Sequence, residues 1–123
     1  MFDSGFGGLT VARAMIDLLP AEDLVYIGDT GRYPYGSKPL DDVRGYAHEL
    51  AWSLVKDFDA KAIVVACNTA TAAGLDELRE ELRARAALDS ARMSGRDDDL
   101  ETHRRHRLAT QIHLDPVQAL EED

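Results

Sequence analysis

The feature that most constrains the fold is a continuous apolar run at residues 62–66, Ala-Ile-Val-Val-Ala. A short run of this kind, rich in β-branched residues, is typical of a strand buried on both faces. Such strands occur mainly in parallel sheets covered by helices. Directly after the run come Cys67, Asn68 and Thr69, and a helical pattern starts near Ala70. The run therefore predicts a strand–helix unit of an α/β protein.

Other segments extend this alternation of strands and helices. Leu24 to Ile27 is a short run with β-branched and aromatic members, which predicts a second strand. Pro20 ends the helix before it, and Pro39 suits the start of the next helix. We therefore predict an α/β fold, a partial doubly wound parallel sheet flanked by helices. The expected core faces are Leu9, Ala12, Met15, Ile16 and Leu19; Val43, Tyr46, Ala47, Leu50, Leu54 and Val55; and Leu75, Leu78 and Leu82.

Three polar segments lie at the chain start or at expected strand ends, namely 3–8, 28–37 and 67–69. Ligands of parallel sheets bind beyond the carboxyl ends of the strands, so we expect the three segments to meet in one cleft. The glycine-rich segment 3–8 suits anion binding through backbone N–H groups. Capping of the following helix by Asp3 or Ser4 is an equally good interpretation. Residues 32–37 fit either a surface turn or a wall of the cleft.

Cys67 is the one cysteine among 123 residues. A cysteine at a strand end is commonly a buried structural residue. However, Asn68 and Thr69 are able to hydrogen-bond a small ligand, and a helix N-terminus directly after a cysteine favours the thiolate. A thiolate there is a candidate nucleophile or proton-transfer base.

Composition narrows the function classes. The net charge of −9 argues against nucleic acid and membrane as partners. One cysteine allows no internal disulfide, and neither a membrane-length apolar run nor a signal-peptide pattern is visible, so we expect a cytoplasmic protein. His103, His106 and His113 lack the ligand frame of a zinc site, so we expect them to be solvated and no metal to bind. We expect a domain at 1–93 and a polar, disordered tail at 94–123.

Four stretches carry a resemblance to a known family. They are Phe2-Asp3-Ser4-Gly5-Phe6-Gly7-Gly8-Leu9-Thr10-Val11, Tyr26-Ile27-Gly28-Asp29-Thr30, Pro34-Tyr35-Gly36-Ser37-Lys38 and Val64-Val65-Ala66-Cys67-Asn68-Thr69-Ala70. Each alone is modest, but together, in this order and spacing, they resemble the glutamate racemase family. The resemblance covers about residues 1–82 and then stops.

The resemblance implies a cofactor-free isomerase that interconverts L- and D-glutamate and supplies D-glutamate for bacterial peptidoglycan, hence for the cell wall and cell shape. In the family, one cysteine thiolate removes the α-proton and a second thiol returns one from the opposite face. Cys67 matches the first cysteine, and Asp3 matches the acidic residue that assists proton transfer. The positions that hold the charged groups of glutamate are matched by Ser4, Tyr35, Gly36, Asn68 and Thr69. Glutamate is the implied partner, and a homodimer stays open.

Two departures from the family stand out. Only Met1 and Phe2 remain of its first strand, which would be central, so we expect a weakened sheet. The family's Cys-Thr-His segment, which carries the second catalytic cysteine, is absent. The chain therefore looks truncated, and we expect it to be inactive alone. The alternatives are a non-catalytic remnant, unfolded or weakly binding glutamate, a related cysteine-pair racemase such as aspartate racemase, and, least of all, a phosphate-binding module.

Overall fold

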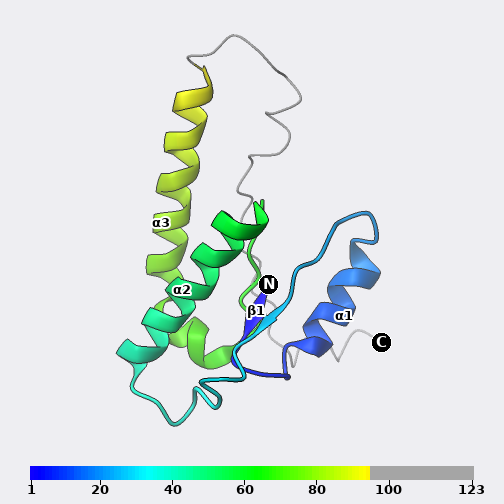
Figure 1. The fold of residues 1–123 in the computed structure, drawn as a ribbon, viewed down its shortest axis with the longest axis vertical. Coiled ribbons are helices and arrows are strands. Elements are labelled where there is room, and N and C mark those ends of the chain that lie inside the picture. Colours follow the sequence, from blue (N-terminus) through cyan, green and yellow to red (C-terminus); the bar gives the residue numbers. More distant parts are fainter. Residues whose placement is uncertain (95–123) are drawn as a thin grey trace.

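The computed structural model describes residues 1–94. Its elements are β1 (Phe2–Asp3), α1 (Leu9–Leu18), β2 (Ile27–Gly28), α2 (Leu40–Phe58) and α3 (Asn68–Ser94). Parallel strands with helices beside them confirm the predicted α/β class (Figure 1). The tail expected at 94–123 lies outside the described residues except for Ser94, and the three histidines His103, His106 and His113 lie wholly outside them.

The sheet is built around β1. On one side β1 pairs in parallel with β2, with Phe2 opposite Ile27 and Asp3 opposite Gly28. On the other side Phe2 forms a parallel bridge to Val65, and the Phe2 N–H donates to the carbonyl of Val64 at 3.0 Å. β1 therefore lies between the two other extended segments, as expected.

The two other strands are shorter than predicted. The strand expected at 24–27 begins only at Ile27, and the run 62–66 has isolated bridge positions at Ala62 and Val65 in place of a continuous strand. A strand exists only where a neighbour offers its N–H and C=O groups. Because β1 spans two residues, it pairs with two residues of β2 on one side and forms one bridge, to Val65, on the other.

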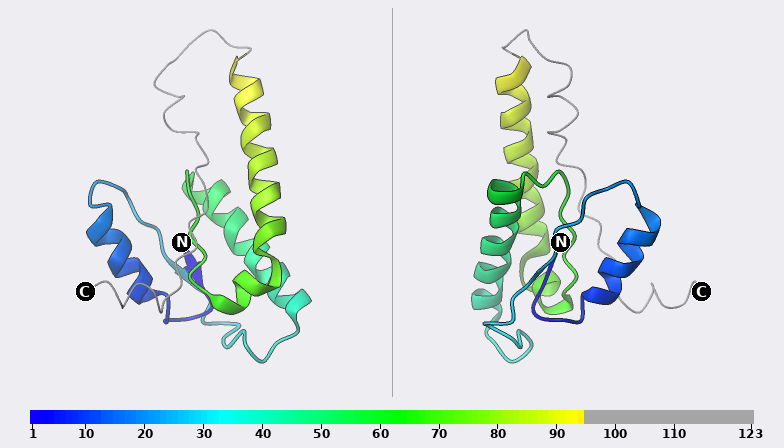
Figure 2. Two further views of the ribbon diagram at one scale, coloured as in Figure 1. Left: turned by 180° about the vertical axis from the view of Figure 1, so that it is seen from behind. Right: turned by 45° about the vertical axis from the view of Figure 1, so that its right-hand side comes forward.

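Successive side chains point to opposite faces of the sheet and pack into two separate cores. From the apolar run, Ile63, Val65 and Cys67 join the cluster under α2 and α3. Val64 and Ala66 join a smaller cluster under α1. This is the two-residue period of extended chain, and it explains why the run has no polar position. Figure 2 shows α1 on one side of the strands and α2 with α3 on the other.

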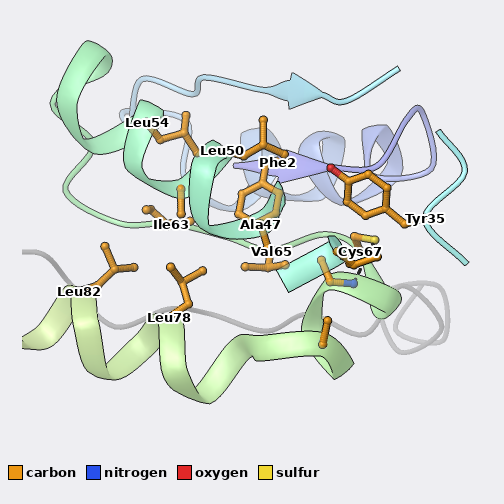
Figure 3. Close-up of a cluster of buried hydrophobic side chains, with 14 residues drawn as sticks. Phe2, Tyr35, Ala47, Leu50, Leu54, Ile63, Val65, Cys67, Leu78 and Leu82 are labelled. Carbon is orange, nitrogen blue, oxygen red and sulfur yellow. Dashed lines mark hydrogen bonds between the residues drawn. The ribbon is translucent and has the colours of Figure 1, made fainter. Parts of the chain in front are cut away.

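The helices α2 and α3 form the better packed layer (Figure 3). Their predicted faces are confirmed, since Val43, Ala47, Leu50, Leu54, Leu78 and Leu82 are buried and Tyr46, Val55 and Leu75 are partly buried. Non-helical backbone at Gly74 bends α3 near its start. The last turns of α3 project from the body of the molecule (Figure 1), and Leu88 is exposed.

The prediction for the core face of α1 was wrong at three of its five positions. Ala12 is buried and Met15 is partly buried, as predicted, but Leu9, Ile16 and Leu19 are exposed, and the unpredicted Val11 is fully buried. The helix meets only a narrow strip of sheet, so it buries one side of its apolar face. Next to it, at the amino ends of the strands, lies an open groove of about 420 Å³, lined among others by Met1, Ile16, Leu19, Leu54 and Phe58. No helix in the described part of the chain is both long and apolar enough to cross a membrane.

Candidate functional site

The three polar segments meet at the carboxyl edge of the sheet. Asp3 ends β1, Gly28 ends β2, and Cys67 follows the bridge at Val65. The strands run in parallel, so all three ends face the same way. The segments also touch, because the Asp29 N–H donates to the Asp3 carbonyl at 2.9 Å. A Cβ on Gly28 would overlap the carbonyl oxygen of Gly5, so only glycine permits this approach.

Asp3 fills the glycine-rich turn with its own carboxylate. One oxygen accepts from the Ser4 N–H and the other from the Gly8 N–H, both at 2.7 Å. Gly8 directly precedes α1, so the buried carboxylate sits at the amino end of that helix, where a negative charge is stabilised. The N-cap of α1 is Gly8, and no described side chain caps the helix, so neither Asp3 nor Ser4 takes the N-cap role; Asp3 binds the N–H of the residue before the helix. The anion that the turn binds is part of the chain itself.

Tyr26 closes the turn from the side of β2. Its hydroxyl lies 3.0 Å from the Gly5 carbonyl and 3.4 Å from the Asp3 carboxylate. Burial, with the Asp3 charge as a second cause, raises the pKa of Tyr26 to about 12. A neutral tyrosine thus stabilises the turn throughout the physiological pH range.

Cys67 lies directly before α3 and is only 7% exposed. Its Sγ accepts from the Ala70 N–H at 3.5 Å, the bond that an N-cap side chain makes. The Cys67 carbonyl accepts from the N–H and the hydroxyl of Thr71, each at 2.9 Å. Of its neighbours, Asn68 is exposed and Thr69 is half-buried. The thiol is therefore fixed at a helix start, with two polar side chains next to it.

Tyr35 lies beside Cys67 in the main core (Figure 3). The side chain is almost fully buried at 1% exposure, and its hydroxyl donates to the Asp29 carboxylate. Burial, the hydrogen bond to Asp29 and the charge of Asp29 all raise the pKa of Tyr35. Gly36, which follows, is exposed.

Sequence reasoning missed Asp29 and Arg32. Asp29 belongs to one of the stretches that carry the resemblance, but it was given no role. The Arg32 Nε donates to its carboxylate at 2.6 Å. The available signal was an acidic residue directly after a strand, with a basic residue three positions further along the same loop.

Asp3 and Cys67 are not joined directly. Among the described residues no hydrogen bond connects the Asp3 carboxylate with the thiol. The Asp3 side chain lies toward α1, near Gly8 and Ala66, whereas Cys67 lies toward α2 and α3. Within residues 1–94 no group of three or more His, Cys, Asp or Glu side chains is arranged to hold a metal ion.

Comparison with known proteins supports the family resemblance over part of the chain. Glutamate racemases of Thermus thermophilus and Mycobacterium ulcerans are each 56% identical to it, over 82 and 80 residues. These matches cover 67% and 65% of this chain but 32% and 29% of the relatives. No family model matches.

Solved structures agree with this comparison. The Thermus thermophilus glutamate racemase, crystallised in complex with β-chloro-D-alanine, matches with a TM-score of 0.63 and covers 65% of this chain and 31% of that one. A glutamate racemase from Bacillus anthracis is 49% identical, with a TM-score of 0.61, and covers 64% of this chain and 29% of its own. The chain spans about a third of the length of these relatives, and over that part it is similar to glutamate racemases.

Proposed function

We propose that the carboxyl edge of the sheet is one half of the amino-acid site of a glutamate racemase, with Cys67 as the thiol that faces one side of the α-carbon. The observation that carries the proposal is the position of Cys67 at a strand end and a helix start. It lies within a segment that has relatives 56% identical to it. A fixed thiol at such an edge suits proton transfer to and from a small ligand.

The chemistry follows from the weak acidity of the α-proton of an amino acid. A thiolate has to meet that hydrogen at close range, while the charged groups of the ligand are held in place. In the proposed site Ser4, Tyr35, Gly36, Asn68 and Thr69 hold these groups through hydroxyl, amide and backbone donors. Neutral donors of this kind bind a carboxylate at modest desolvation cost.

Asp3 is proposed to assist proton transfer at Cys67 from the other side of the edge. Its carboxylate already accepts two backbone N–H groups, so it also fixes the turn that presents Ser4. This double use predicts that removal of Asp3 affects the stability of the turn as well as ligand binding.

Racemisation needs proton transfer on both faces of the α-carbon, and this chain has one cysteine. We therefore expect the purified 123-residue protein to form no measurable D-glutamate from L-glutamate. A chiral chromatography assay tests this expectation, with Cys67→Ser as the control. Clear turnover that depends on Cys67 would contradict it.

A non-catalytic amino-acid-binding segment is the second candidate. Two observations favour it: Cys67 and Tyr35 are both buried, and the Asp3 carboxylate is occupied. Titration of the labelled protein with L-glutamate, D-glutamate and L-aspartate, followed by NMR, tests binding and distinguishes the glutamate site from an aspartate site. We expect the largest shifts at Ser4, Gly36 and Thr69 with glutamate. Larger shifts with aspartate would favour the related racemase, and no shifts would contradict a binding site.

A further inference from the structure

The proposed site is closed in this structure. Cys67 and Tyr35 belong to the same buried cluster, and Figure 3 shows the phenol ring next to the thiol. Both side chains lie almost wholly out of contact with solvent. A ligand that reaches the sulfur must therefore displace the Tyr35 ring or the loop that carries it.

Asp29 fixes the Tyr35 ring from the end of β2. It accepts the Tyr35 hydroxyl with its Oδ2, and its own N–H is bound by Asp3, so both its backbone and its side chain are held. The centre of the Tyr35 ring also lies 5.6 Å from the centre of the Tyr46 ring on α2. The Asp29 side chain is 10% exposed, and an anion buried to this degree needs a cationic partner.

Arg32 is that partner, and it links the loop to α2. Its Nε donates to Asp29 at 2.6 Å, while its Nη1 donates to Glu49 at 2.8 Å. The guanidinium lies 4.2 Å from the centre of the Tyr46 ring, within the range of a cation–π contact. One planar group therefore makes three contacts. A lysine ammonium, which lacks the fork of donors, does not reproduce them.

The two ends of this link differ in strength. The Asp29 end is largely buried, whereas the Glu49 side chain is 69% exposed. Exposed ion pairs are screened by water and contribute little, but partly buried charge-assisted hydrogen bonds contribute more. The link is therefore firm at the Tyr35 end and weak at the α2 end.

We propose that Arg32 is a positioning residue of this site: through Asp29 it holds the Tyr35 ring against Cys67, and release of its contact with Glu49 opens the way to the thiol. The inference rests on the proposed function only for the identity of the ligand that enters the site. The shielding of the Cys67 thiol by the Tyr35 ring can be measured without any amino-acid ligand.

The rate of Cys67 alkylation by iodoacetamide measures this shielding. The protein has one cysteine, so the thioether formed as the thiolate displaces iodide reports on one site. The full chain is compared with Arg32→Gln, Arg32→Lys and Glu49→Gln. We expect Arg32→Gln to raise the rate about tenfold, the effect of one charge-assisted hydrogen bond on a closed-to-open equilibrium. Arg32→Lys should restore part of the protection, and Glu49→Gln should raise the rate about twofold to threefold.

The matched control is Arg79→Gln, which removes an arginine of similar exposure to Arg32, paired with Asp76 three residues away on α3. It should leave the alkylation rate unchanged. Thermal melts followed by circular dichroism show whether each variant stays folded, and if Arg32→Gln does not, Glu49→Gln decides the question. A rate for the deciding variant that equals wild type, or an equal increase in Arg79→Gln, would overturn the proposal. Failure to bind glutamate, with the expected order of rates intact, would instead contradict the proposed function.

Discussion

The two faces of the sheet are covered very unequally. Fourteen buried residues form the cluster toward α2 and α3, and five form the cluster toward α1. Stabilisation by burial scales with the apolar area removed from water, so most of it comes from the α2 and α3 side. The α1 side leaves large apolar residues in contact with solvent, among them Leu18 at 70% exposure.

The candidate site lies across this boundary. Cys67 and Tyr35 belong to the well packed face, whereas Asp3 and Tyr26 belong to the thin one. Hydrogen bonds to the Asp3 carboxylate, rather than apolar packing, hold the turn of residues 3–8. Apolar burial therefore fixes the thiol half of the site, and polar bonds fix the acidic half.

The largest effect should come from the core on the α2 side. We expect Leu54→Ala to lower the free energy of unfolding by about 2–5 kcal/mol, because Leu54 is fully buried and its loss leaves a cavity. Val11→Ala, in the thin layer, should cost about 1–2 kcal/mol. Urea unfolding followed by Trp52 fluorescence measures both, with Leu88→Ala on exposed α3 as the control. Equal losses of unfolding free energy in Leu54→Ala and Val11→Ala would contradict the claim that the α2 side contributes more stability than the α1 side.

A smaller effect is expected for the polar half of the site. Asp3→Asn keeps the shape of the side chain but removes the charge that accepts the Ser4 and Gly8 N–H groups. We expect a loss of about 1–3 kcal/mol in the free energy of unfolding. Asp76→Asn, whose side chain is exposed on α3, should change it by less than about 0.5 kcal/mol. A stability equal to wild type for Asp3→Asn would show that the turn does not depend on this charge.

The smallest effect is a pH dependence at Tyr26. Its pKa is about 12 in the folded protein against 10.0 for an ordinary tyrosine, so the folded state holds its proton more tightly. The stability from this residue is complete below pH 10 and is lost as the pH rises toward 12. Because the pKa of Tyr35 is also raised, tyrosinate absorbance should show two tyrosines that titrate late, and Tyr26→Phe should remove one of them. A Tyr26→Phe variant that keeps both late steps would contradict the assignment to Tyr26.

The sequence predicted the helices on the α2 side well because both bury a regular apolar face. It failed at α1, where Leu9, Ile16 and Leu19 have the spacing of a core face but meet no second layer. Periodicity shows which face of a helix is apolar, but not whether anything packs against it. The strand lengths also failed, since strand pairing depends on the length of the neighbour, which local sequence does not record.

For the site, the carboxyl-edge rule correctly placed Asp3, Gly28 and Cys67 together. It did not separate the two faces of the edge, so it gave no sign that Asp3 and Cys67 lie on opposite sides of the sheet. The rule also could not predict the contacts among Asp29, Arg32 and Glu49, because Glu49 lies 17 residues after Arg32 on another element. The roles assigned to the site residues stay predictions.

The central claim is that Cys67 faces the α-carbon of a bound amino acid from one side. Incubation of the full chain with each enantiomer of glutamate in deuterium oxide tests it most directly, with NMR to follow the α-proton and chiral chromatography to follow configuration. A single thiol takes the proton and returns a solvent-derived deuteron to the same face, so we predict deuterium in one enantiomer, configuration retained, and no exchange in Cys67→Ser. Exchange equal to that of Cys67→Ser, or inversion of configuration, would contradict the account.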